Sequence, residues 1–235
     1  MIEFVEPGDR GRRFTAHRKV RLSDAGPDAV LRPDGLARYL QDVAGDDWDD
    51  TGVVSDETWV VRRTAVRVAA GGGWPAIGDW VSLTTWCGGS GAAWAERRTN
   101  VTVGSRLMLE AVAIWVPIDR TGHPLRLRQN FFDVYAEAAG GRKVSGRIEA
   151  SSPPADAAVR DWPLRRADFD VVGHVNNAAV WAALSEVADG SVTWAAVNHH
   201  SPLEGGERVS LATSAGRLWL LVDGVVRVSG EFASR

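Results

Sequence analysis

A dense group of polar side chains lies between residues 168 and 177, which read DFDVVGHVNN. The run holds two carboxylates (Asp168 and Asp170), one imidazole (His174) and two amides (Asn176 and Asn177). A carboxylate can activate water or attack a carbonyl carbon, and an imidazole can transfer a proton near neutral pH. These residue types favour acyl transfer, with Asp170 as the base or nucleophile and His174 as the proton-transferring group.

A helix is expected directly after this run, because four apolar residues fall on one helical face: Val180, Ala183, Leu184 and Val187. The amino end of a helix presents unpaired N–H groups and a positive dipole end to a developing oxyanion, and Gly173 would let the backbone come close to a substrate. A purely structural interpretation stands beside this one. It makes Asn176 or Asn177 an N-cap, Gly173 a turn residue and His174 a core histidine.

The helix and strands that must position these residues are expected to occur twice, because the chain shows a weak internal duplication. Three pairs of segments match in the same order: 22–44 with 164–188, 78–85 (GDWVSLTT) with 206–213 (GERVSLAT), and 98–116 with 217–232. The copies differ most just before the helix, where the first reads DAGPDAVLRPDG and lacks the imidazole and the amides. The duplication therefore predicts a scaffold built twice that carries its chemistry once.

Each copy has the pattern of one long helix followed by a meander of strands. In the first copy, Leu36, Tyr39, Leu40 and Val43 share a helical face, and the later runs alternate and are rich in Val, Thr and Trp. Glycine-containing breaks join these runs. The pattern predicts an α+β fold, a double hotdog in which two tandem repeats each wrap a curved antiparallel sheet around a long central helix. A ten-stranded barrel is the weaker alternative, because the helices would have no interior to pack against.

The duplication also sets the expected domain boundaries. We predict an N-terminal repeat over residues 1–145, a linker over residues 146–159 and a C-terminal repeat over residues 160–235. The linker contains Pro153 and Pro154 among small residues that interrupt both periodicities.

Composition narrows the possible functions. Hydrophobic residues make up 45% and charged residues 24%, which is ordinary for a globular protein. No run approaches the roughly 20 apolar residues that cross a bilayer, and charges occupy the place of a signal peptide's apolar region. We therefore expect a cytoplasmic protein without a membrane partner. The net charge of −3 gives no field that favours nucleic acid.

Cysteine and histidine elsewhere carry weaker signals. The single cysteine, Cys87, excludes an internal disulfide and a thiolate metal cluster, and no histidine nearby in the sequence could activate it as a nucleophile. His199 and His200 are adjacent, so on a strand they would face opposite sides and could not easily bind one metal ion. No metal site is predicted.

The motif of residues 168–177 resembles that of the acyl-acyl carrier protein thioesterases, whose second hotdog half carries D-x-D-x-N-x-H-V-N-N before its helix. The segments WVVRRT (59–64), GDWVSLTTW (78–86) and LEAVAIWVPID (109–119) also look like bacterial members, so the resemblance covers nearly the whole chain. It implies hydrolysis of the thioester between a fatty acyl chain and the phosphopantetheine arm of acyl carrier protein. The product would be free fatty acid, which ends chain elongation in fatty acid synthesis.

The resemblance also implies residue roles. Asp170 and His174 correspond to the catalytic Asp and His of the family, and Asn176 and Asn177 correspond to the paired amides that organise the turn. It implies no metal or organic cofactor, with acyl carrier protein as the partner of a monomer or homodimer. The substrate-binding residues expected from it are Gly173, Glu186, Trp59, Leu36 and Leu40.

Two departures from the family pattern affect the mechanism. The Asn that plant members carry between the catalytic Asp and His falls here on Val172, whose side chain has no polar atom. The Glu on the strand after the helix has no clean equivalent in residues 197–207, where the candidates are Asn198, His200, Glu204 and Glu207. These departures leave open a simpler mechanism in which Asp170 alone activates water or attacks the thioester.

Three alternatives belong to other functional classes. An acyl-CoA thioesterase on the same fold differs only in the carrier of the acyl chain. A non-catalytic acyl-binding or sensing protein would explain Val172 and the missing Glu. A hotdog dehydratase is the least favoured, because it needs its His and its acid on different elements.

Overall fold

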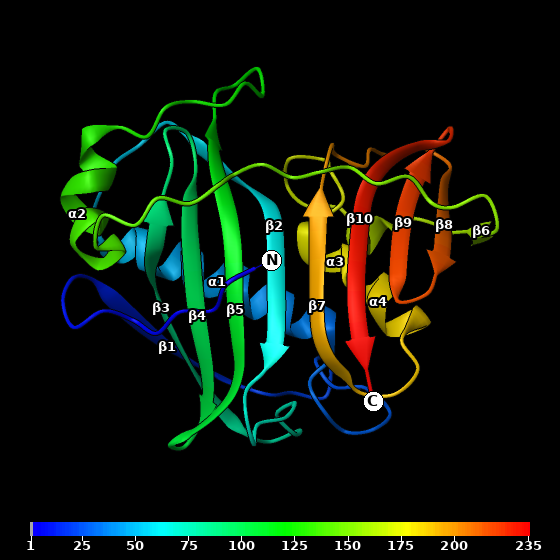
Figure 1. The fold of residues 1–235 in the computed structure, drawn as a ribbon, viewed down its shortest axis with the longest axis horizontal. Helices are drawn as coiled ribbons and strands as arrows, with labels where there is room; N and C mark the ends of the chain where they lie inside the picture. The colour runs from blue at the N-terminus through cyan, green and yellow to red at the C-terminus, as the bar shows by residue number, and fades with distance from the viewer. Residues whose placement is uncertain (1) are drawn as a thin grey trace.

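The computed structural model describes residues 2–235, which form one ten-stranded antiparallel sheet with helices on one face (Figure 1). Along the sheet the strands run in the order β1-β3-β4-β5-β2-β7-β10-β9-β8-β6. Their bounds are β1 (Arg13–Lys19), β2 (Thr58–Val68), β3 (Trp80–Ser90), β4 (Ala95–Val103), β5 (Arg106–Ile118), β6 (Ala158–Asp161), β7 (Val192–His199), β8 (Val209–Ser214), β9 (Arg217–Val222) and β10 (Val225–Ser234).

The order of strands repeats across the middle of the sheet. The first half reads β1-β3-β4-β5-β2 from its edge inward, and the second half reads β6-β8-β9-β10-β7 from the opposite edge. In each half, the second strand along the chain, β2 or β7, is therefore the one that pairs with the other half of the sheet. There β2 pairs antiparallel with β7 over five residue pairs, from Arg63 opposite Asn198 to Arg67 opposite Trp194.

The first-half helix, α1 (Pro33–Asp50), lies against the sheet. Pro33 is its first residue, where a missing N–H costs no hydrogen bond, and Asp34 lies in its first turn. Its buried face includes Leu36, Leu40 and Val43, which join one hydrophobic core with residues from both halves of the sheet. Burial of this apolar stripe fixes the helix on the sheet.

The second half does not contain the single long helix that the sequence predicts. Two short helices, α3 (Asn177–Val180) and α4 (Ala182–Val187), take its place and meet at Trp181. The Trp181 N–H donates to the carbonyls of Ala178 and Ala179, which tightens the turn at the junction. The Trp181 side chain is buried in the core, so packing of this large ring accompanies the break.

A further helix, α2 (Gln129–Ala139), follows β5 and was not predicted from the sequence. Phe131, Tyr135 and Ala139 are buried at i, i+4 and i+8 on one face, and α2 packs against β3. The helix ends at Gly140, whose φ of 56° is the left-handed conformation that glycine adopts at low cost. In Figure 1, α2 lies beside the carboxyl-terminal end of α1.

The chain between the halves runs in extended form across the face of the sheet opposite the helices (Figure 1). Arg142 pairs with Glu96 of β4 at 2.5 Å and with Glu3 at 2.7 Å. Farther along, the carbonyl of Ser151 accepts a hydrogen bond from the indole of Trp219 in β9 at 2.7 Å. Residues 142–151 thus attach to both halves of the sheet.

Within residues 2–235, no helix has the length and apolar character needed to cross a membrane.

Packing of α4 on the shared core gives the first prediction. Leu184 is 1% exposed, so Leu184→Ala removes buried methyl groups and should lower the free energy of unfolding by about 2–5 kcal/mol in urea titrations. Leu22→Ala is the matched control, because Leu22 is 82% exposed and its truncation should change stability by less than about 0.5 kcal/mol. Equal effects of the two substitutions would contradict the packing of α4.

Candidate active site

The motif forms a tight loop between the short 3₁₀ helix η1 (Arg166–Asp168) and α3. Asp168 is buried and pairs with the Arg165 guanidinium at 2.7 Å, while its other carboxylate oxygen accepts the Arg165 N–H. Its carbonyl accepts the N–H of Asn176 at 2.8 Å, which ties the two ends of the loop together. Asp168 therefore anchors the loop.

Asp170 and His174 are close along the backbone, but no hydrogen bond joins their side chains. The Asp170 N–H donates to the His174 carbonyl at 2.9 Å, and Asp170 Oδ1 accepts the N–H groups of Val172 at 2.9 Å and His174 at 3.3 Å. Gly173 has a φ of 88°, the left-handed conformation that this loop requires. Within residues 2–235, Asp170 Oδ2 and the His174 ring accept and donate no hydrogen bond, so both remain able to bind water or substrate.

The two asparagines have different places. Asn176 is the N-cap of α3, and its Oδ1 accepts the N–H of Ala178 at 2.8 Å. Asn177 lines a small cavity of about 20 Å³ together with Leu40 and Gln41 of α1. We call this space the motif-side cavity. It is the place where the motif meets the first-half helix.

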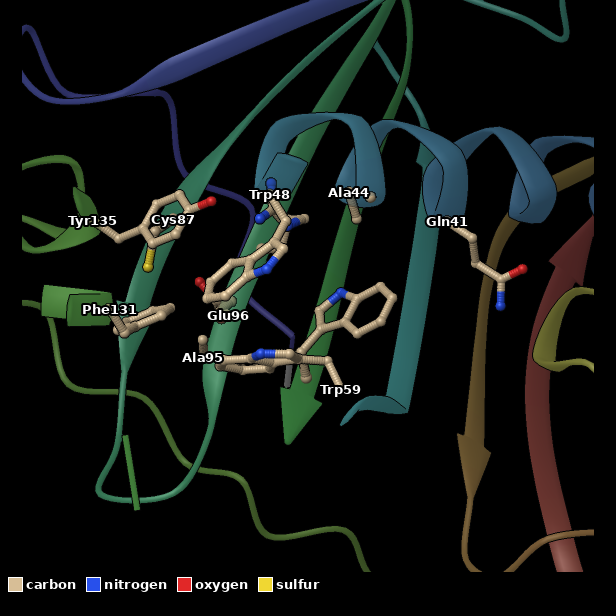
Figure 2. A pocket seen from close by; sticks show the side chains of 12 residues that line it. Gln41, Ala44, Trp48, Trp59, Cys87, Ala95, Glu96, Phe131 and Tyr135 are labelled. Carbon is tan, nitrogen blue, oxygen red and sulfur yellow. The ribbon is translucent and has the colours of Figure 1, made fainter. Parts of the chain in front are cut away.

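A larger cavity of about 220 Å³ lies in the first half, and we call it the aromatic cavity (Figure 2). Trp59, Trp48 and Phe131 face one another there, with ring centroids 5.9 Å apart for Trp48 and Trp59 and 5.7 Å apart for Trp59 and Phe131. Its full lining is Gln41, Ala44, Gly45, Trp48, Trp59, Cys87, Ala95, Glu96, Arg97, Trp115, Phe131 and Tyr135.

The two cavities meet at a shared wall made by Gln41, Arg97 and Trp115, each of which lines both. Asn177 of the motif lines the motif-side cavity and not the aromatic cavity. Asp170 and His174 line neither cavity. The motif thus contributes Asn177 to the motif-side cavity, whereas Asp170 and His174 lie on the loop outside both cavities.

The remaining predicted site residues are dispersed. Trp59 lines the aromatic cavity and Leu40 the motif-side cavity, whereas Leu36 is buried in the core and lines neither. Glu186 is exposed at the end of α4, 4.0 Å from Arg160, and borders a polar groove in the second half. The structure therefore does not bring Glu186 to the aromatic cavity.

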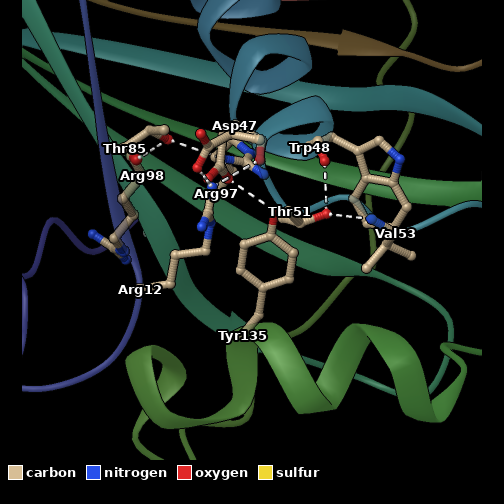
Figure 3. Close-up of polar contacts among 10 residues, drawn as sticks. Arg12, Asp47, Trp48, Thr51, Val53, Thr85, Arg97, Arg98 and Tyr135 are labelled. Atoms are coloured by element: carbon tan, nitrogen blue, oxygen red, sulfur yellow. Dashed lines mark hydrogen bonds and ion pairs between the residues drawn. The ribbon is translucent and has the colours of Figure 1, made fainter.

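A buried carboxylate holds one end of the aromatic cavity in place (Figure 3). Asp47 of α1, 1% exposed, accepts hydrogen bonds from Arg12 at 2.7 Å, Arg97 at 2.6 Å and Tyr135 at 2.9 Å. These donors come from the segment before β1, from β4 and from α2. Burial raises the pKa of Tyr135 to about 12, and nearby Asp47 adds to this shift while Arg97 opposes it.

Two further titratable groups are held neutral by burial. Cys87 lines the aromatic cavity, and burial raises the pKa of its thiol, which disfavours the thiolate that a nucleophile requires. Burial and the neighbouring Arg62 lower the pKa of His199 to about 3, so its ring is neutral near pH 7. Residues 2–235 contain no group of three or more His, Cys, Asp or Glu side chains placed to hold a metal ion.

Four residues that line the aromatic cavity were not predicted from the sequence as site residues: Gln41, Trp115, Phe131 and Tyr135. The alternation of residues 109–116 assigned Trp115 to a strand without showing which face borders a cavity. The i, i+4 spacing of Phe131 and Tyr135 was the available signal for an amphipathic α2. Their place beside α1 depends on tertiary packing.

Comparisons with solved structures define the class of fold. The 12:0-ACP thioesterase from Umbellularia californica aligns with a TM-score of 0.75 and 18% identity, over 97% of this chain and 99% of that chain. An acyl-ACP thioesterase from Bacteroides thetaiotaomicron aligns with a TM-score of 0.76 and 16% identity, over 94% and 96%. The chain has the hotdog-type fold of thioesterases.

Sequence comparison gives the family. Residues 11–135 match the family model described as Acyl-ACP thioesterase N-terminal domain, and this chain belongs to the acyl-ACP thioesterase family. An uncharacterized protein of Mycobacterium tuberculosis is 24% identical over 217 residues, which cover 89% of this chain and 86% of that protein. The resemblance to this family is thereby confirmed by a match that lies in the first half of the chain, and the family supports hydrolysis of acyl thioesters.

Removal of the Asp47 carboxylate should strongly destabilise the fold. Asp47→Ala removes the acceptor of the buried Tyr135 and the ion-pair partner of Arg97, and it should lower the free energy of unfolding by about 3–5 kcal/mol in denaturant titrations. Asp50→Ala is the control, because Asp50 pairs with the same Arg12 at 2.6 Å but is more than half exposed. Its loss should cost about 0–1 kcal/mol, and a similar cost for both variants would be inconsistent with the buried network.

The tyrosine pKa shifts predict a measurable pH dependence. The chain has two tyrosines, and burial raises the pKa of both Tyr39 and Tyr135 above the ordinary value of 10.0. At about pH 11 most of the folded protein should therefore lack tyrosinate absorbance, which appears on unfolding. Stability from the protonated Tyr135 is complete below pH 10 and is lost toward pH 12, so Tyr135→Phe should lose less stability over that interval. Half-ionisation of both phenols in the folded protein at pH 10, as for tyrosines of ordinary pKa, would refute this.

Proposed function

We propose that this protein is a cytoplasmic acyl-acyl carrier protein thioesterase that releases free fatty acid and so terminates fatty acid synthesis. The observation that carries the proposal is the aromatic cavity, an apolar space that shares wall residues with the motif-side cavity, which Asn177 of the motif lines. Such a cavity suits an acyl chain, and a motif of carboxylate, imidazole and amides suits its hydrolysis. The two family members compared above support acyl carrier protein as the partner.

In the proposed architecture the chain is a double hotdog with repeats at residues 1–145 and 160–235, joined by residues 146–159. The first repeat holds the acyl chain in the aromatic cavity, with Trp59 in its wall. The second repeat supplies the motif. Wall residues from both helices, such as Leu40 and Asn177, then surround the substrate near the thioester.

In the proposed reaction, a water molecule adds to the thioester carbonyl carbon while one of its protons passes to Asp170. Asp170 Oδ2 is available for this proton, because Oδ1 is occupied by the loop N–H groups. The carbon–sulfur bond then breaks, and the proton reaches the leaving sulfur through His174, which gives a free acid and a thiol. The reaction consumes one water and requires no cofactor.

Few helix amides are available to stabilise the oxyanion. The Ala178 N–H donates to Asn176 Oδ1 and the Ala179 N–H to the Asn176 carbonyl, so the N-cap occupies both. The Asn177 side chain at the motif-side cavity is then the better placed donor in this proposal.

Turnover of matched thioesters tests the function. Purified protein should release thiol from medium-chain acyl carrier protein thioesters, with a lower kcat/KM for the corresponding acyl-CoA. Asp170→Asn should lower kcat at least 100-fold, because the amide oxygen can still accept the loop N–H bonds while no carboxylate remains to take the proton. Asp189→Asn, an exposed change on the polar groove, is the control and should retain wild-type kcat.

Other outcomes support the alternatives. Preference for acyl-CoA would favour a CoA thioesterase on the same fold. If fatty acids raise the Tm while no thioester of either carrier is hydrolysed, the protein is a non-catalytic acyl-binding protein.

A further inference from the structure

Two indole N–H groups in the wall of the aromatic cavity have no hydrogen-bond acceptor. Nε1 of Trp59 and Nε1 of Trp115 are both buried and unpaired within residues 2–235. By contrast, the indoles of Trp74, Trp94 and Trp219 donate to main-chain carbonyls at 2.7, 2.9 and 2.7 Å. A buried donor without an acceptor is costly and uncommon, so two in one ligand cavity point to an acceptor supplied by the ligand.

One of these two donors, Trp115, lies toward the motif, whereas Trp59 lines the aromatic cavity alone. Trp115 lines both cavities, and so does Gln41, whose amide forms no hydrogen bond within residues 2–235. In Figure 2, Gln41 extends from α1 at a distance from the rings of Phe131 and Tyr135. The third shared residue, Arg97, is already bonded to Asp47 and Thr85. Unused hydrogen-bonding capacity therefore lies at the wall between the two cavities, beside Asn177.

The other part of the aromatic cavity offers less to a polar group. Tyr135 gives its hydroxyl proton to Asp47, Cys87 donates to the carbonyl of Gly89, and Phe131 is apolar. Beside these side chains, Trp59 supplies one buried N–H that has no acceptor within residues 2–235, and its ring centroid lies 5.7 Å from that of Phe131. An oxygen atom near Trp115 and Gln41 would find two donors.

We infer that the cavity selects acyl groups that carry a hydrogen-bond-accepting oxygen close to the thioester, of the 3-hydroxyacyl or 3-oxoacyl class. The inference rests on the proposed function and names the substrate class of that site. The reaction is unchanged: water adds to the carbonyl carbon, the carbon–sulfur bond breaks and the thiol takes the proton. The oxygen substituent takes no part in these steps, and it accepts hydrogen bonds from Trp115 and Gln41.

Matched eight-carbon substrates test the inference. A cavity of about 150 Å³ holds one benzene, so a space of about 220 Å³ suits a chain of moderate length. With carrier-protein thioesters of octanoate, 3-hydroxyoctanoate and 8-hydroxyoctanoate, kcat/KM should be about tenfold or more higher for the 3-hydroxy chain than for octanoate. The 8-hydroxy chain should be the poorest. Equal or better turnover of octanoate, or a preference for the 8-hydroxy chain, overturns the inference.

Variants identify the donors. Trp115→Phe and Gln41→Leu remove an N–H donor with little change of size, and each should reduce the ratio of 3-hydroxyoctanoyl to octanoyl kcat/KM toward one. Trp94→Phe is the matched control, because its indole donates to the Val144 carbonyl and lines neither cavity. It should keep the full ratio, and an equal loss in all three variants would contradict the assignment.

Binding of free acids separates this inference from the proposed function. In calorimetric titrations 3-hydroxyoctanoic acid should bind about tenfold more tightly than octanoic acid, whether or not any thioester is hydrolysed. Preferential binding of 3-hydroxyoctanoic acid without turnover of any thioester would support the inferred ligand class and refute the proposed thioesterase activity. Turnover without any preference in kinetics or binding would refute the inference alone, and absence of both would refute both.

Discussion

The pairing of β2 with β7 is the constraint on which the candidate site depends. Main-chain hydrogen bonds between residues 63–67 and 194–198 join the two halves into one sheet, so both halves place their helices on the same face. There α1 and α3 pack against each other, and one hydrophobic core contains residues of both halves. Gln41 and Asn177 meet in the motif-side cavity only because of this arrangement. Separation of the halves would divide the cavity wall from the motif.

The two halves share a strand order but differ in the residues that surround the carboxyl-terminal end of the helix, α1 in the first half and α4 in the second. In the first half, α2 brings Phe131 and Tyr135 next to Trp48, and Asp47 binds donors from three other segments. Buried charge requires this complete set of partners, because an unpaired carboxylate in the interior would be strongly destabilising. The same bonds therefore fix the end of α1 and the position of the rings. In the second half the corresponding end of α4 borders a groove lined mainly by polar and charged residues.

Local sequence patterns were sufficient to predict part of this structure, and the rest depends on tertiary packing. The helical face of Leu36, Leu40 and Val43 and the N-cap at Asn176 follow from periodicity and capping, which act within a few residues. The helix is broken at Trp181 although the apolar helical period of the sequence continues through this residue. The break therefore depends on tertiary packing, in which the Trp181 ring is buried. The cavities could not be derived from one strand or helix. Trp115 and Gln41 are more than 70 residues apart and share a wall only after β5 and α1 pack.

The position of Val172 changes how the motif loop must work. Its side chain is largely exposed, while its N–H is the group that binds Asp170 Oδ1. The loop is therefore held by main-chain N–H groups, a role that any non-proline residue at position 172 can fill. A polar side chain there is not required to position the acid. Since Oδ1 is bound in this way, only Oδ2 can meet water, which limits the directions from which a nucleophile can approach. In the proposed site, Asn177 and Gln41, which line the motif-side cavity, are then better placed than residue 172 to orient the acyl group.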